Sequence, residues 1–183
     1  MTVPVSLPGM HSPGAGFDQP FEMLDACHDR VRRSLALLAR LRGYLQDEGC
    51  DDSARQAARD VLRYFDIAAP LHHEDEERHV FAPLLAAHAE GVVADLVRRL
   101  QHDHVLMAEC WAEARQPLER LAQGALQGFA PMDEAALDRF AGCYADHLRH
   151  EDDSIYPAAR ALLDMEALRA MGQEMAVRRG VRV

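Results

Sequence analysis

The sequence predicts an all-α protein, folded as an antiparallel up-and-down four-helix bundle with an extended N-terminal arm and a short C-terminal helix. Two observations support this fold class. Apolar residues recur at helical spacing through four long segments. Hydrophobic residues make up 49% of the 183-residue chain but aromatic residues only 6%, and alanine, leucine, arginine and glutamate are abundant. Short links between the long segments make an antiparallel bundle the simplest packing.

Each predicted helix starts at a residue suited to its first turn. The long helices are expected over residues 18–48, 53–90, 92–122 and 133–157, and the short one over 164–179. Pro70 is expected to kink the second helix, and Pro117 to bend or shorten the third. The expected N-cap residues are Asp18, Ser53 in a Ser-x-x-Gln capping box, Asp133 and Asp164.

Residues 1–17 are rich in proline and glycine and are expected to form a flexible arm. Residues 18–183 then form one helical domain. The chain has neither a run of 18 apolar residues nor a signal-peptide pattern, so the cytoplasm is the expected location. Four cysteines without a C-x-x-C pair are expected to be reduced, buried thiols.

The formal net charge of −10 excludes a uniformly basic face. Binding to DNA or RNA needs such a face to neutralise phosphates, and so does binding to an anionic membrane surface. Neither nucleic acid nor a membrane is therefore an expected partner.

Two predicted helices carry the same His-x-x-x-Glu spacing, at His73–Glu77 and at His147–Glu151. Residues four apart on a helix are separated by about 40° of rotation and roughly 6 Å of rise, so an imidazole and a carboxylate project to one side. A weak internal repeat supports the pair, because Pro83 and Pro157 each stand ten positions after the histidine. The repeat favours His73 and His147 as metal ligands.

Neighbouring residues fit this repeat less well. His72 would place its proline at the eleventh position, and His150 has a serine four residues later. Both are therefore expected to flank the site. Glu74 is an optional extra carboxylate and Asp152 an alternative to Glu151, whereas two further acidic residues are expected to stay outside the ligand shell: Asp75 and Glu76.

The first and third helices each offer one histidine on or beside an apolar stripe, His28 and His104. His104 is favoured over His102, which is about 200° away around the helix. The remaining histidines are expected outside the ligand shell: His11, His79 and His88.

Four imidazoles and two carboxylates combine borderline nitrogen with hard oxygen donors, a set that suits iron, with zinc or manganese as alternatives. The carboxylates can bridge two ions and leave room for an oxo or hydroxo bridge, or for a small ligand such as O2 or NO. Without a cation, burial of these groups would be costly. The predicted ligands are His28, His73, Glu77, His104, His147 and Glu151.

These residues resemble the hemerythrin-like family, also called the HHE cation-binding domain, over about residues 20–180. The resemblance implies an antiparallel four-helix bundle with a non-haem di-iron centre, and its ligands fall on the same six positions. It rests on Cys27-His28-Asp-Arg30, Leu71-His-His-Glu-Asp-Glu-Glu77 through Pro83, Asp103-His104 with Trp111, and His147-x-x-x-Glu151 through Tyr156-Pro157.

One departure concerns the third helix. Oxygen-carrying hemerythrins have a His-x-x-x-His pair there, but Leu100 and Ala108 flank His104 at that spacing. The resemblance therefore implies roles of the bacterial relatives, which sense O2 or NO, handle iron, or respond to oxidative and nitrosative stress. Proteins that repair iron–sulfur clusters share the spacing but carry an extra N-terminal domain, which the 17-residue arm cannot be.

We expect a metal- and gas-binding protein rather than a turnover enzyme, with a small diatomic ligand as its partner. The sequence also leaves open whether the chain binds a protein partner or forms a homodimer. The alternative is a di-iron oxidoreductase that reduces NO, peroxide or O2, for which Tyr144 is a candidate proton donor or else a core residue. A ferritin-like site needs Glu-x-x-His on two helices, and only Glu76–His79 has that form.

Overall fold

The computed structural model describes residues 16–181, and in that range it is all-helical, which confirms the predicted class. Residues 1–15 of the predicted arm lie outside the described residues. No helix in the described range is both long and apolar enough to cross a membrane. The elements are α1 (Pro20–Asp47); α2 (Asp52–Arg63), η1 (Tyr64–Ala68), α3 (Ala69–Glu76), η2 (Glu77–Phe81) and α4 (Ala82–Ala87); α5 (Val92–Ala122); α6 (Pro131–Gly142), α7 (Tyr144–His150), η3 (Glu151–Ile155) and α8 (Tyr156–Leu162); and α9 (Met165–Arg178).

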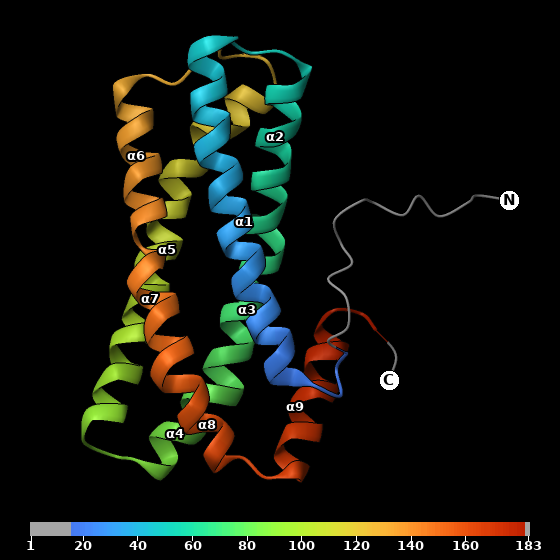
Figure 1. Ribbon diagram of the computed structural model, residues 1–183, viewed down its shortest axis with the longest axis vertical. Coiled ribbons are helices and arrows are strands. Elements are labelled where there is room, and N and C mark those ends of the chain that lie inside the picture. The colour runs from blue at the N-terminus through green and yellow to red at the C-terminus, as the bar shows by residue number, and fades with distance from the viewer. Residues whose placement is uncertain (1–15, 182–183) are drawn as a thin grey trace, which may run out of the picture.

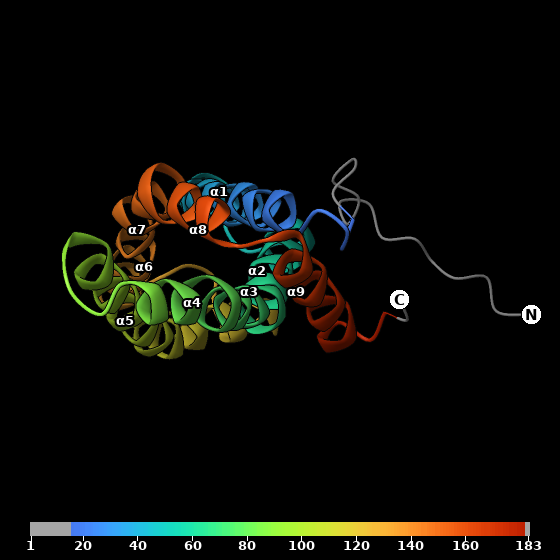
Figure 2. The same ribbon diagram turned by 90° about the horizontal axis from the view of Figure 1, so that it is seen from below.

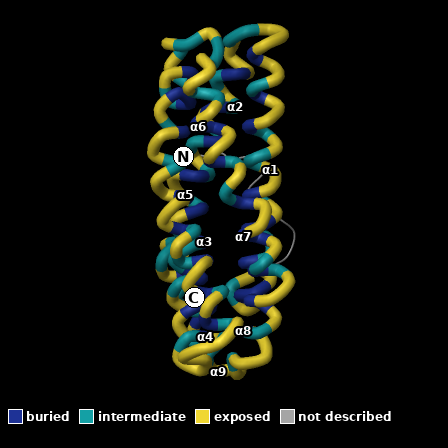
Figure 3. Tube along the Cα trace, turned by 90° about the vertical axis from the view of Figure 1, so that its left-hand side faces the viewer, coloured by how far each residue is buried: buried dark blue, intermediate teal, exposed yellow. Residues whose placement is uncertain are grey.

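The long helical stretches run side by side along the long axis of the molecule, and α9 packs at one end near the start of α1 (Figures 1 and 2). Their buried faces point inward, as Figure 3 shows. The apolar side chains form two clusters. The upper core, toward α2 and α6, includes Leu38, Val61, Leu118 and Phe140. The lower core, toward α4 and α8, includes Phe21, Val80, Leu100 and Ile155.

Successive stretches pass through the two cores in opposite orders. In α1, Leu24 of the lower core precedes Val31 of the upper core. In the second stretch the order reverses, because Phe65 of the upper core precedes Val80 of the lower core. The next two stretches continue this alternation. Each stretch therefore crosses the layer between the cores once, and buried polar residues fill that layer.

The helix starts differ from the prediction at three of the long helices. The Asp51 side chain accepts a hydrogen bond from the Ala54 N–H, so Ser53 lies inside α2 and is not its cap. α1 and α6 each begin at a proline close to the expected aspartate. Asp164 caps α9 as predicted, accepting two N–H groups of the first turn. A proline at the first helical position costs no hydrogen bond there.

Three π-helices interrupt the long stretches, and each ends two residues before a proline. η1 precedes Pro70, η2 precedes Pro83 and η3 precedes Pro157. A proline lacks the N–H and collides with the carbonyl four residues earlier, and a wider π turn accommodates it without breaking the helix. Pro117 lies inside α5, which continues to Ala122, so that helix is not shortened.

Candidate metal centre

Two groups of histidine and glutamate side chains fill the layer between the cores. Within each group, one ligand atom from every residue lies within 4.8 Å of the others, and all six residues are buried. Their elements converge from all four long stretches. The first group is His28, His72 and Glu76, and the second is His104, His147 and Glu151.

The two glutamates occupy the middle of the layer and each contacts both groups. Glu76 lies within 3.6 Å of the Nε2 atoms of both histidines of its own group and 3.5 Å from His104 Nε2. Glu151 lies 3.1 Å from His147 Nε2 and 3.2 Å from His28 Nε2. Carboxylates in this position can bridge two ions held by the two groups.

Carboxylates outside the layer lie beside the Nδ1 atoms of three of the four imidazoles, and the contacts at His28 and His104 are hydrogen bonds. An imidazole held by Nδ1 presents Nε2 to the layer, which is the usual arrangement of a metal-binding histidine and its outer carboxylate. Gln101 donates to Glu77 at 2.7 Å. The pairs are His28–Asp152 at 2.7 Å, His104–Glu77 at 2.9 Å and His147–Asp103 at 3.5 Å.

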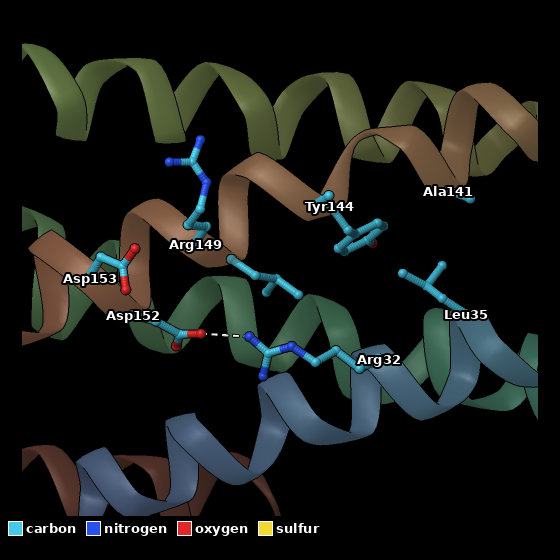
Figure 4. Close-up of a pocket in the computed structure, with 9 residues that line it drawn as sticks. Arg32, Leu35, Ala141, Tyr144, Arg149, Asp152 and Asp153 are labelled. Atoms are coloured by element: carbon cyan, nitrogen blue, oxygen red, sulfur yellow. Dashed lines mark hydrogen bonds and ion pairs between the residues drawn. The ribbon is translucent and has the colours of Figure 1, made fainter.

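Figure 4 shows that the Asp152 carboxylate also pairs with Arg32, whose Nη2 lies 2.5 Å from it. This pair lines a surface pocket of about 510 Å³ between α1 and α7. Asp152 therefore contacts the outer nitrogen of His28, and Glu151 rather than Asp152 belongs to one of the two groups. Glu74, the other optional carboxylate, pairs with Arg78 at 2.7 Å.

The buried groups of the layer have strongly shifted pKa values. Burial lowers the pKa of His72 to about 3, so its imidazole is neutral. Burial also disfavours the charged form of His28, but the carboxylates of Glu151 and Glu76 outweigh it and raise its pKa to about 10. The layer therefore favours positive charge beside its carboxylates, and metal ions would compete with protons for that place.

Several polar atoms of the layer have no hydrogen-bond partner among residues 16–181. They are Glu76 Oε2, both carboxylate oxygens of Glu151, His104 Nε2, and the Nδ1 atoms of His72 and His147. Buried polar atoms without partners cost free energy, and two cations would satisfy the glutamate oxygens and His104 Nε2. Imidazole nitrogen and carboxylate oxygen also form a donor set that iron, manganese or zinc accepts. The residues present therefore fit a metal pair.

Four of the six predicted ligands meet in this layer: His28, His104, His147 and Glu151. His73 and Glu77 belong to neither group. The His73 ring stacks on that of His104 with centroids 4.1 Å apart, and Glu77 contacts His104 Nδ1. His72 and Glu76, which were expected outside the ligand shell, occupy the corresponding places. Which residues bind metal stays a prediction, now revised to this set.

A signal in the sequence indicates His72 and Glu76. Buried positions of the second stretch recur every three or four residues. The internal repeat favours His73 and Glu77, which lie outside this stripe. Both residues continue it without a break. The stripe is Ala54, Ala58, Val61, Phe65, Ala69, His72, Glu76 and Val80.

The buried tyrosine of the metal layer is Tyr156, which the sequence reasoning did not single out as functional. Its hydroxyl lies 2.9 Å from His28 Nε2 and donates to Glu76 Oε1 at 2.5 Å. Burial among carboxylates raises its pKa well above the usual value, so it stays protonated. Tyr144, the earlier candidate, packs in the upper core against Phe65 and Phe140 instead.

The other acidic and histidine candidates lie outside both groups. Asp75 is buried and pairs with Arg178, the last residue of α9, and with Arg179 directly after it, each at 2.5 Å. His79 lies 3.3 Å from Glu174. His150 is half-buried, and His88 and His102 are exposed; His11 lies outside the described residues.

Comparison with known proteins agrees with this geometry. An uncharacterised protein of Haemophilus influenzae is 31% identical over 168 residues, which cover 92% of this chain and 94% of that protein. The family model described as "Hemerythrin HHE cation binding domain" matches residues 19–159, which include all six residues of the two groups. The chain therefore belongs to the hemerythrin HHE cation-binding domain family.

Proposed function

We propose that this protein is a cytoplasmic non-haem di-iron protein of hemerythrin type, which binds or senses O2 or NO or handles iron in oxidative or nitrosative stress. The observation that carries the proposal is the position of Glu76 and Glu151, each of which contacts imidazoles of both groups. Bridging carboxylates between two end groups are what a metal pair needs. The proposed scaffold is an antiparallel four-helix bundle made by the first four helical stretches.

The proposed ligands are two histidines and one glutamate for each ion. An iron pair held this way would supply coordination positions for a small diatomic molecule and would exchange electrons with it. The residues around it have structural tasks: Asp152 and Glu77 orient two imidazoles by hydrogen bonds, Asp103 lies 3.5 Å from a third, and the apolar cores above and below exclude bulk water. The proposed ligands are His28, His72, Glu76, His104, His147 and Glu151.

A second candidate function is that of a di-iron oxidoreductase acting on NO, peroxide or O2, including a role like that of iron–sulfur cluster repair proteins. Tyr156 favours it, because a buried phenol that stays protonated beside His28 and Glu76 is placed to donate a proton. Turnover of NO or peroxide with a supplied reductant, lost in Tyr156→Phe while bound iron is retained, would select this function.

Metal analysis of the purified protein tests the first proposal, together with absorption spectra before and after exposure to air, NO or azide. About two irons per chain and a ligand-dependent near-ultraviolet band are expected. His72→Ala should lose metal, whereas His102→Ala removes an exposed histidine and should retain it. One zinc per chain, or metal-free protein after growth in iron-rich medium, would contradict the di-iron assignment.

A further inference from the structure

A second pocket, of about 490 Å³, lies between α1 and the α2–η1 stretch. None of its lining residues belongs to the two histidine and glutamate groups. Its volume falls within the range of small-molecule sites, roughly 300–1,000 Å³. We name it the arginine groove after the residue type that dominates its lining.

The lining of the arginine groove is positively charged, whereas the chain as a whole is negatively charged. The chain carries a net charge of −10, yet four arginines line the groove with one carboxylate, Asp60. Arg63 pairs with that carboxylate at 2.9 Å. Arg30 and Arg40 form no ion pair or hydrogen bond with any residue in the described range. Two guanidinium groups thus remain available to an external anion, and their planar donors suit carboxylate and phosphate.

Apolar side chains complete the groove. Ile67 is 59% exposed, and it lines the groove with Leu37 and the ring of Tyr64. Tyr64 and Ile67 belong to η1. η2 and η3 begin at or beside the glutamates of the metal layer, whereas η1 lines this groove. The π turn that accommodates Pro70 therefore also shapes one wall of the groove.

We propose that the arginine groove binds a small amphipathic organic anion. Its carboxylate or phosphate group would pair with Arg30 or Arg40, and its apolar part would lie on Leu37 and Ile67. The two arginines stand ten residues apart on α1, about 15 Å along the helix axis, and Leu37 lies between them in the sequence. The proposal is independent of the metal centre.

Calorimetric titration with decyl phosphate, below its micelle concentration, tests the proposal on the full chain. One saturable site is expected. The double variant Arg30→Gln/Arg40→Gln should weaken binding about tenfold or more, because charge-assisted hydrogen bonds are lost. The matched control, Arg99→Gln/Arg169→Gln, makes the same change of charge at exposed arginines outside the groove and should bind like the unaltered protein.

The apolar contact has its own variant pair. Ile67→Asp should weaken decyl phosphate binding about tenfold or more, and Val92→Asp, at a valine that is 85% exposed, should not. Both positions are exposed, so folding should be retained, as circular dichroism will check. Iron content should be unchanged in all these variants, which separates this site from the metal centre.

Two further probes decide the class of ligand. Inorganic phosphate alone should bind at least about tenfold more weakly than decyl phosphate, because it lacks the apolar part. Equal binding of the two would overturn the proposal, as would equal binding by the groove and control variants. Sedimentation with phosphatidylcholine–phosphatidylserine vesicles, without saturable binding of monomeric decyl phosphate, would mean a membrane contact and would also overturn it.

Discussion

The α3–η2 and α7–η3 segments have similar sequences. The buried histidine and glutamate nevertheless stand at different distances from the proline in the two segments. Each has a histidine and a glutamate four apart, a π-helix, and a proline two residues after that π-helix. Glu151 is the first residue of η3, whereas Glu76 stands one residue before η2. The position of each proline therefore determines where the π-helix lies. The packing of each helix determines which of its faces points inward.

The buried stripes explain the difference in register. Val61, Phe65 and Ala69 of the upper core lead at three- and four-residue steps to His72 and Glu76. In the other segment, the stripe of upper-core residues leads to His147 and Glu151 by the same rule. Since apolar contacts orient a helix, the stripe leads to both His/Glu pairs of the buried layer, whereas the repeat leads to only one of them.

The largest expected effect is on metal binding, when Glu76 and its neighbour Glu77 are replaced in turn. Glu76→Ala should abolish the paired metal site, because it removes the carboxylate that contacts both groups. Glu77→Ala removes only the partner of His104 Nδ1 and should lower metal affinity about 10- to 100-fold. Metal titration of both variants measures this. If Glu77→Ala abolished the site and Glu76→Ala spared it, the register defined by the prolines would be the correct one.

The next effect compares the carboxylates that orient the imidazoles. Asp152 contacts His28 Nδ1 at 2.7 Å, whereas Asp103 is 3.5 Å from His147 Nδ1. Asp152→Asn should therefore lower metal affinity by about tenfold or more, and Asp103→Asn by less. Competition with a chelator gives both affinities. A larger loss of metal affinity in Asp103→Asn than in Asp152→Asn would contradict the prediction that the shorter carboxylate–imidazole contact contributes more to metal affinity.

Of the two segments, α3–η2 alone has an ion-paired aspartate directly before its buried glutamate, and this pairing should contribute to the free energy of unfolding. Asp75 pairs with Arg178 and Arg179, whereas the residue before Glu151 is His150, whose Nδ1 has no partner among the described residues. Asp75→Ala should lower the free energy of unfolding by about 2–3 kcal/mol, because two buried ion pairs are lost. Urea unfolding measures it, with the exposed Asp153→Ala as control. A change below about 0.5 kcal/mol would contradict the role of this pairing.

The smallest effect concerns Tyr156, whose counterpart in the proline register is Ala82. Tyr156→Phe removes the hydroxyl contacts with His28 and Glu76 but keeps the buried ring. The variant should retain its metal, lose about 1 kcal/mol of stability and shift the absorption band of the metal-bound protein. Loss of metal would instead show that the phenol is needed to assemble the site.

Much of this structure could be predicted from the sequence, because helix formation and burial depend on local patterns. The helical class and the polar layer at His28, His104, His147 and Glu151 follow from apolar spacing. The N-cap at Asp51 and the inclusion of Tyr156 could not be predicted with the same assurance. A cap depends on which of several adjacent polar side chains reaches a free N–H, and Tyr156 approaches His28 from 128 positions away.

The hydrogen bonds that orient the imidazoles of His28 and His104 are formed by carboxylates of the chain itself, Asp152 and Glu77. A set of nitrogen and oxygen donors discriminates little among divalent ions, and its intrinsic affinities rank zinc and copper above iron. Cellular supply must then decide which element is loaded. Protein isolated from cells grown on different trace-metal diets should carry different occupants in the same coordination geometry.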